Sequence, residues 1–383
     1  MKVVILADAP YALQELCGIS LLERLLRTLQ RAGVRAAVVL SRTLEPIDVE
    51  LRKKSSPRSE LEVTLKPASE PISGDELRLT LPADVVWDSR LLSLLLAQEK
   101  PCVLLDSGQP TGAMISRGPA ATTETRILEV AEQPTYSREM RRDLPLLRIP
   151  APGDDDERKA AERRILAAAQ KGALDLPALV HGPVETFFVA RLCKTSITPN
   201  QLTALCNVVA WATAVFFATG YLVTGTCCAL AVGVLDGLDG KQARVKVETS
   251  AAGKLEHWLD AFYELAWALA LAFYLHASGA LPSAWWYLLL LLVAEGVGGL
   301  AKLSVIRHYG CLIDELTPLD RKIRLFSGRR NIYIWILAFG LLLGAPASAF
   351  VLIAAWQAVS AFVHVLRAAW VTKIRPLDLT AGR

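Results

Sequence analysis

Two pairs of acidic side chains lie where consecutive apolar segments end and begin. Asp236 and Asp239 are three residues apart at the end of one segment, and Glu256 and Asp260 are four apart at the start of the next. Both spacings place the partners on one face of a helix. Ionisable groups at membrane depth are costly, so they indicate a functional site. Solvated charges at helix ends would explain a single Asp, but they are the minority interpretation for two pairs.

The donor atoms of these side chains define the chemistry. Four clustered carboxylates repel one another unless cations neutralise them, and oxygen ligands suit hard ions such as Mg²⁺, or Mn²⁺. Mg²⁺ is usually bound together with substrate phosphates. His257 is the only histidine near the cluster, which argues against zinc. The sequence therefore predicts a divalent-metal site for phosphate chemistry.

The elements that must position the carboxylates are apolar segments long enough to cross a membrane. A spanning helix needs about 20 residues. We predict an all-α membrane domain of six transmembrane helices over residues 201–375, in which the boundary between the last two is the least distinct. The six stretches lie near residues 201–222, 226–243, 257–278, 283–305, 331–345 and 346–371.

The distribution of Lys and Arg sets the predicted orientation. The connections near 222–226, 276–284 and 344–348 contain neither residue, whereas the opposite connections are rich in both. By the positive-inside rule, both termini and the carboxylates are cytoplasmic. The N-terminus lacks the apolar core of a signal peptide, so the region before the spans should stay in the cytoplasm. We expect an integral protein of the inner, cytoplasmic membrane.

The region before the spans alternates strand and helix patterns. This alternation predicts an α/β domain with a largely parallel sheet over residues 1–165. The polar stretch 150–157 is interpreted as a break. Residues 166–200 are predicted to form a linker and a juxtamembrane amphipathic helix at 183–192, although a core helix would fit that pattern nearly as well. The predicted elements cover residues 2–8, 20–31, 35–41, 77–81, 89–98, 102–106 and 158–171.

Composition gives no support for nucleic acid binding or for a cysteine-based metal or disulfide framework. The net charge of +4 gives no case for nucleic acid binding. The seven cysteines form no CxxC pair and show no metal-ligand spacing, so unpaired thiols in a reducing compartment are expected.

The first acidic pair belongs to a longer motif. It reads Asp236-x-x-Asp239-Gly240-x-x-Ala243-Arg244, followed after eight residues by Gly253. This motif resembles the signature of the CDP-alcohol phosphotransferase family. The preceding Ile197-Thr198-Pro199-Asn200-Gln201-Leu202-Thr203 resembles the loop that leads into the first span of that family. The resemblance covers about residues 180–375.

The second acidic pair departs from the family signature, which continues as Gly-x3-Asp-x3-Asp. Counting strictly from Gly253 puts His257 and Ala261 at the two Asp positions, whereas deleting one residue puts Glu256 and Asp260 there. We favour the shifted alignment because Ala can neither ligate a metal nor take a proton. Residues 256–260 also resemble the Asp-His-Gly-Cys-Asp of the eukaryotic choline and ethanolamine branch. The alternative, in which His257 contributes at this position, stays open.

The resemblance implies a phosphotransferase mechanism. Two Mg²⁺ ions would bridge the acidic residues and the diphosphate of a CDP-alcohol, with Asp236, Asp239 and Glu256 mainly as ligands. Asp260 would be a ligand and also the general base that takes the proton of the acceptor hydroxyl, and CMP would leave. The implied substrate contacts are Thr198, Pro199, Asn200, Gln201, Gly240, Ala243, Arg244 and Ser250.

The implied partners follow from this reaction. The donor would be CDP-diacylglycerol or a CDP-polyol, and the acceptor an inositol phosphate or another polyol phosphate. We also expect contacts with membrane lipids, and a homodimer. Arg321, Lys322 and Arg324 could hold an anionic acceptor, although a positive-inside loop explains them equally well.

The first domain shows a second resemblance, to sugar nucleotidyltransferases. It rests on residues 6–24 and 83–92, the latter resembling the segment around a metal-binding Asp. Where that family has a Gly-rich phosphate loop and basic residues, residues 8–15 of this chain contain neither. We interpret the domain as degenerate and non-catalytic, with a Rossmann-type sheet. The layout is similar to that of bifunctional inositol-phosphate cytidylyltransferase/di-myo-inositol-phosphate phosphate synthases.

Two other functions remain as alternatives. In a bifunctional enzyme, the first domain would also make the CDP-alcohol from CTP. In an ion-coupled transporter, the intramembrane carboxylates would bind ions or protons. A transporter would need neither the Asp-Gly-x-x-Ala-Arg motif nor a nucleotidyltransferase-like domain, and no inverted repeat is evident in the sequence.

Overall fold

The computed structural model describes residues 1–53, 55–72, 76–117, 125–248 and 253–374, without the side chains of 253–257 and 374. The chain forms two compact units. The first comprises Met1–Lys171, Phe188–Ile197 and Lys241–Ser250. The second comprises Gly172–Phe187, Thr198–Gly240 and Ala251–Arg383.

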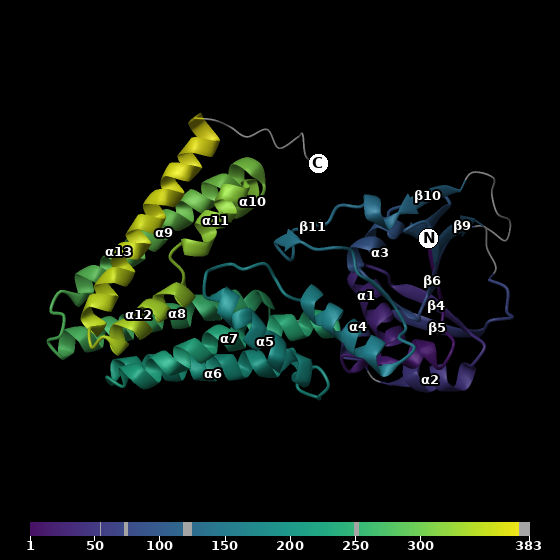
Figure 1. Ribbon diagram of the computed structural model, residues 1–383, viewed down its shortest axis with the longest axis horizontal. Helices are drawn as coiled ribbons and strands as arrows, with labels where there is room; N and C mark the ends of the chain where they lie inside the picture. Colours follow the sequence, from purple (N-terminus) through teal and green to yellow (C-terminus); the bar gives the residue numbers. More distant parts are fainter. Residues whose placement is uncertain (54, 73–75, 118–124, 249–252, 375–383) are drawn as a thin grey trace. The chain divides into compact units, whose positions relative to one another are not determined.

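The first unit is built on a seven-stranded sheet with the order β10-β8-β9-β6-β1-β4-β5 (Figure 1). Its strands are β1 (Lys2–Leu6), β4 (Ala36–Ser41), β5 (Glu62–Pro67), β6 (Leu77–Pro82), β8 (Cys102–Asp106), β9 (Gln109–Arg117) and β10 (Arg126–Glu129). Three short antiparallel pairs accompany it: β2 (Glu15–Leu16) with β3 (Ile19–Ser20), β7 (Val85–Trp87) with β13 (Arg148–Pro150), and β11 (Tyr136–Ser137) with β12 (Arg142–Asp143).

The sheet is largely parallel, as predicted, and departs from the parallel arrangement at one strand, β9. The pairs β1–β4, β1–β6, β4–β5 and β8–β10 are parallel, but β9 runs antiparallel to both β6 and β8. The reason is the connection between β8 and β9, which consists only of Ser107 and Gly108, both with positive φ. So short a turn can join only antiparallel strands.

Four helices accompany the sheet, namely α1 (Leu21–Arg31), α2 (Leu44–Arg52), α3 (Ser89–Leu96) and α4 (Asp155–Ala168). Helix α1 begins where the Ser20 side chain accepts a hydrogen bond from the Glu23 amide, at 3.2 Å. Its apolar face, which includes Leu22, Leu26 and Leu29, is fully buried in the core of the unit. Short 3₁₀ turns cover Tyr11–Leu13, Ser56–Arg58 and Val130–Glu132.

The predicted polar break at 150–157 is shorter than expected. Helix α4 already begins at Asp155, because the Asp154 carboxylate accepts hydrogen bonds from the amides of Asp156 and Glu157, at 2.9 and 2.8 Å. An Asp in this position caps the first turn, and its negative charge interacts favourably with the positive end of the helix dipole.

Most of the second unit is helical. Its helices are α5 (Ala178–Leu192), α6 (Pro199–Ala218), α7 (Leu222–Lys246), α8 (Gly253–Ala277), α9 (Ala284–Tyr309), α10 (Ile313–Leu316), α11 (Pro318–Phe326), α12 (Arg330–Leu342) and α13 (Pro346–Ala369), with a π-helical turn at Trp370–Ile374. The C-terminal ends of α5 and α7 belong to the first unit. Helices α9 and α13 lie side by side (Figure 1). A Cβ on Gly298 would lie 3.6 Å from the Ala361 Cα, so the two backbones approach closely there.

Among the described residues, five helices are long and apolar enough to cross a membrane, rather than the predicted six. They cover Pro199–Ala218, Leu222–Lys246, Trp258–Ala277, Ala284–Tyr309 and Pro346–Lys373. The segment predicted at 331–345 forms α12, whose 13 residues extend about 20 Å at 1.5 Å per residue. That length is short of the roughly 30 Å hydrocarbon core.

Candidate active site

The carboxylate that the structure encloses most fully is that of Asp239, on α7. Its side chain is 4% exposed. One carboxylate oxygen accepts a hydrogen bond from the Thr203 hydroxyl of α6 at 2.5 Å, and the other accepts from the Gly240 amide. These bonds hold the carboxylate in one orientation, so the position of the Asp239 side chain is well defined.

Asp236, one turn earlier on α7, is paired with a basic residue of α12. Arg330 donates to the Asp236 carboxylate at 2.6 Å and lies 3.2 Å from a carboxylate oxygen of Glu264 on α8. Its guanidinium also contacts the Tyr263 hydroxyl and lies over the Tyr263 ring, 5.4 Å from the centroid. Arg330 therefore joins α7, α8 and α12 and supplies positive charge to an acidic cluster.

The third carboxylate, Asp260, lies on α8, one turn before Glu264, which Arg330 contacts. Three of the four predicted metal ligands thus lie on described parts of two helices, Asp236 and Asp239 on α7 and Asp260 on α8. The fourth, Glu256, and the alternative, His257, lie on α8, with side chains outside the described part of the chain.

The donor chemistry of this cluster fits a divalent cation. Asp236, Asp239 and Asp260 offer oxygen atoms only, as Mg²⁺ and Mn²⁺ prefer, and Arg330 is the countercharge that the structure shows for Asp236. Among the described side chains, no three His, Cys, Asp or Glu residues are arranged closely enough to hold a metal ion. Asp236, Asp239 and Asp260 are thus candidate donors that the structure does not arrange as a closed metal site.

Helix α5 packs closely against the same stretch of α7 at two glycines of α7. A Cβ on Gly237, between the two Asp residues, would lie 2.2 Å from a carboxylate oxygen of Glu185. A Cβ on Gly233, one turn earlier, would lie 2.9 Å from the His181 ring. Both glycines are thus required by close packing, and Glu185, which is 8% exposed, is a further buried acidic residue beside the motif. Burial lowers the pKa of His181, which keeps this contact neutral at pH 7.

The predicted loop before the first span forms the start of α6. The Thr198 hydroxyl accepts from the Gln201 amide at 3.3 Å, and the Gln201 side chain accepts from the Thr198 amide at 2.9 Å. This reciprocal pair is a capping box, with Pro199 at the first helical position. Asn200 is exposed. These residues fix the start of the helix that carries Thr203.

The second half of the motif lies in the first unit. Arg244 donates to the Ala169 carbonyl at 2.8 Å, and the Ala243 carbonyl accepts from the Glu248 amide at 2.8 Å. Lys241 is fully buried against the Gln170 side chain. Ser250, also predicted to contact substrate, lies outside the described residues.

Three basic residues predicted for an acceptor site lie on α11. Arg324 pairs with the Asp314 carboxylate and donates to the Ala173 carbonyl at 2.8 Å, so it has a structural role. Lys322 is exposed, and Arg321 is half-buried.

Sequence reasoning missed several residues of the cluster, namely Thr203, Tyr263, Glu264, Arg330 and Glu185. A signal existed for Glu264, because it is four residues after Asp260 in an apolar segment and intramembrane acids indicate function. Arg330 has the appearance of one more basic residue in the connections rich in Lys and Arg. Its pairing with Asp236 spans 94 residues, and no local pattern encodes it.

A comparison with known families identifies the C-terminal region. The profile of the CDP-alcohol phosphatidyltransferase family matches residues 196–372. The C-terminal region belongs to that family. The chain is accordingly a membrane enzyme, and transfer of a phosphoalcohol from a CDP-alcohol is the reaction that membership implies. CDP-alcohol phosphatidyltransferases are typically Mg-dependent.

Other comparisons add less. No curated protein matches the chain. The crystal structure of HddC from Yersinia pseudotuberculosis is similar to 43% of this chain over 98% of its own length, at 12% sequence identity and a TM-score of 0.32. A likeness of this size assigns no activity to the first unit.

Proposed function

We propose that this enzyme transfers the phosphoalcohol group of a CDP-alcohol to an acceptor hydroxyl and releases CMP, with its active site at the Asp236–Asp239–Asp260 cluster. The observation that carries the proposal is that these carboxylates, with Thr203 bound to Asp239 and Arg330 bound to Asp236, lie inside the region that matches the family. The proposed donor is CDP-diacylglycerol or a CDP-polyol, and the acceptor is a polyol phosphate such as inositol phosphate.

Each acidic residue has a proposed role. Asp236, Asp239 and Glu256 would hold two Mg²⁺ ions, or Mn²⁺, together with Asp260. When bound, the ions supply neutralisation of the charge that develops on the phosphoryl oxygens. Asp260 takes the proton of the acceptor hydroxyl. The hydroxyl oxygen forms a bond to the phosphorus that bears the alcohol, and the bond from that phosphorus to the CMP oxygen breaks.

The motif residues beyond Asp239 are proposed to contact the nucleotide. Gly240 allows close approach of the donor to the backbone. Arg244 is anchored through its Nε atom to the Ala169 carbonyl, which fixes the guanidinium at the end of the motif. Ala243 and Ser250 complete the proposed contacts.

We propose that the first domain does not catalyse nucleotidyl transfer. Asp88 is one of two Asp residues, with Asp84, in the segment that resembles the surroundings of a metal-binding Asp, and its carboxylate is already engaged by other groups of the fold. Its carboxylate accepts from the Arg90 amide at 2.9 Å and the Leu147 amide at 3.0 Å, and it pairs with the Arg90 guanidinium at 2.8 Å. A carboxylate that caps a helix and closes an ion pair is poorly suited to bind a cation.

One assay separates the proposal from the bifunctional alternative. Purified full-length protein in nanodiscs with Mg²⁺ should release CMP from one or more CDP-alcohols in the presence of a polyol phosphate. With CTP and the same polyol phosphates, it should release no pyrophosphate. Pyrophosphate release that Asp88→Asn abolishes would establish the bifunctional enzyme instead.

We also propose that α12 is a sixth, short span, and that both termini are cytoplasmic. Asp236, which Arg330 contacts, lies ten residues before the end of α7 at Lys246, or about 15 Å along the helix. Because α12 begins at the depth of Asp236, it needs fewer residues to reach the opposite face of the membrane. Helix α5, with Leu179, Val180 and Phe187 exposed, would lie in the cytoplasmic interface.

The proposed topology predicts which single cysteines react with an impermeant thiol reagent. In a cysteine-free background, Ser278→Cys and Leu343→Cys should be labelled from the periplasm, because both positions are exposed and lie in connections without Lys or Arg. Lys322→Cys should be labelled only after the membrane is opened. Labelling of Lys322→Cys in intact cells would invert the orientation and place the carboxylates away from cytosolic CDP-alcohols.

A further inference from the structure

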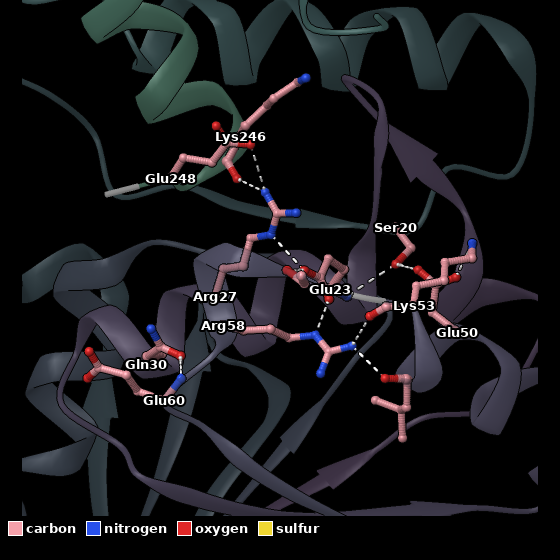
Figure 2. A network of polar contacts seen from close by, with 12 residues as sticks. Ser20, Glu23, Arg27, Gln30, Glu50, Lys53, Arg58, Glu60, Lys246 and Glu248 are labelled. Atoms are coloured by element: carbon pink, nitrogen blue, oxygen red, sulfur yellow. Dashed lines mark hydrogen bonds and ion pairs between the residues drawn. The ribbon is translucent and has the colours of Figure 1, made fainter. Parts of the chain in front are cut away.

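Helix α1 of the first domain contacts the C-terminal end of α7 through two buried arginines. Arg24 donates to the Val245 carbonyl at 2.5 Å, and Arg27 donates to the Lys246 carbonyl at 2.8 Å. Arg27 also pairs with the Glu248 carboxylate at 3.3 Å. Figure 2 shows the Arg27 guanidinium directed at Lys246 and Glu248. These contacts join parts of the chain more than 200 residues apart, within one compact unit.

The receiving groups are carbonyls that a helix end cannot satisfy by itself. The last four carbonyls of an α-helix lack partners within the helix, and the C-terminal end carries partial negative charge. Two guanidinium groups therefore both satisfy and stabilise the end of α7. The residue two positions before Lys246 is Arg244, the last residue of the Asp-x-x-Asp-Gly-x-x-Ala-Arg motif.

Arg24 and Arg27 are also held by other residues of the first unit. Arg27 donates to Glu23 at 2.7 Å, and Arg58 donates to the other oxygen of Glu23 at 2.6 Å (Figure 2). Burial raises the pKa of Glu23, but hydrogen bonds from Ser55 and Arg27 and the charges of Arg27 and Arg58 outweigh it, so the net pKa is lowered. Arg24 has a second bond, to the Leu16 carbonyl at 2.8 Å.

Other parts of the first unit hold the same stretch of α7. Lys246 donates to the Thr195 carbonyl at 2.9 Å, and Gln242 donates to the Ile197 carbonyl at 2.5 Å. Arg244 donates a hydrogen bond to the carbonyl of Ala169, the residue that caps the C-terminal end of α4. The stretch 241–248 is thus integrated into the N-terminal domain, although α7 continues without interruption to Asp236 and Asp239.

We propose that Arg24 and Arg27 are positioning residues of the phosphotransferase, which hold the nucleotide-binding end of the motif through α7. The N-terminal domain is then a scaffold of the donor site. This inference rests on the proposed function for its kinetic consequence, while the contact itself can be measured without turnover.

The test compares Arg27→Ala with Arg31→Ala in the full-length protein in nanodiscs. Arg31 lies one turn further along α1, carries the same charge, and pairs with Glu139 on the surface instead. Arg27→Ala should raise the KM for the CDP-alcohol by roughly tenfold, as expected for losing a hydrogen bond from a charged donor, with little change in the KM for the acceptor. Amides in 241–248 should exchange hydrogen faster. Arg31→Ala should change neither quantity.

Two further variants distinguish the proposed positioning role from a general loss of folding. Arg27→Lys, which keeps the charge, should recover part of the donor KM, and Glu248→Gln should reproduce a weaker form of the Arg27→Ala effect without altering α1. Unchanged exchange over 241–248 and an unchanged donor KM in Arg27→Ala would overturn the inference. So would a fall in kcat alone that tracks the fraction of unfolded protein. If the wild type releases no CMP, the proposed function fails, and the exchange comparison still tests the contact.

Discussion

Asp239→Asn is expected to abolish CMP release while the protein remains folded. The Asn side chain has the shape of Asp: its amide oxygen can accept from the Gly240 amide and its NH2 group can donate to the Thr203 hydroxyl oxygen, so packing around this buried position is kept. The substitution removes the negative charge that the proposed metal site requires. Its effect on turnover should exceed the roughly 10²–10³-fold cost of removing a single electrostatic contact from an active site.

The measurement is CMP release at saturating Mg²⁺, with thermal unfolding of the purified variant as the check on folding. Thr203→Val provides a graded comparison, because it removes the hydroxyl that orients Asp239 and leaves the carboxylate in place. We expect it to be impaired but active. Full turnover by Asp239→Asn, or by the wild type in excess EDTA, would contradict a metal-dependent role for this carboxylate.

The parts of the site that follow from local sequence were predictable. The spacing of Asp236 and Asp239 defines one helix face, and Thr198 and Gln201 have the spacing of a capping box, which the structure contains. The strand at 102–106 was also predicted with its observed bounds. In each case the physical cause lies within a few residues, so the pattern is visible in the sequence.

The parts that were missed depend on contacts between distant segments. Arg330 meets Asp236 across 94 residues, and Arg27 meets Lys246 across 219. In the sequence, each of these arginines has the appearance of an ordinary basic residue in a loop or on a surface helix. The antiparallel placement of β9 has a local cause, the turn at Ser107 and Gly108, but the alternation of strands and helices concealed it.

Helix α8 is where the sequence departs most from the family signature, and it gives the second large expected effect. Asp260→Asn should reduce turnover by far more than the roughly 10²–10⁴-fold typical of losing a general base, because Asp260 is also proposed to bind the metal ions. Asp260 lies on α8, one turn before Glu264, and Arg330 contacts the carboxylates of both Glu264 and Asp236.

The neighbouring positions distinguish the two alignments. Glu256 is four residues before Asp260 and His257 is three before it, so helical spacing admits either residue on the same side, and their side-chain chemistry separates them. If Glu256 is a ligand, Glu256→Gln should be nearly as severe as Asp260→Asn, and Glu256→Asp should keep some activity because the charge is retained. His257→Ala should then be comparatively mild. The unshifted alignment predicts the reverse, with His257 essential and Glu256 dispensable. CMP release by the four variants in nanodiscs decides the order, and an inactive His257→Ala beside an active Glu256→Gln would transfer the ligand role to His257.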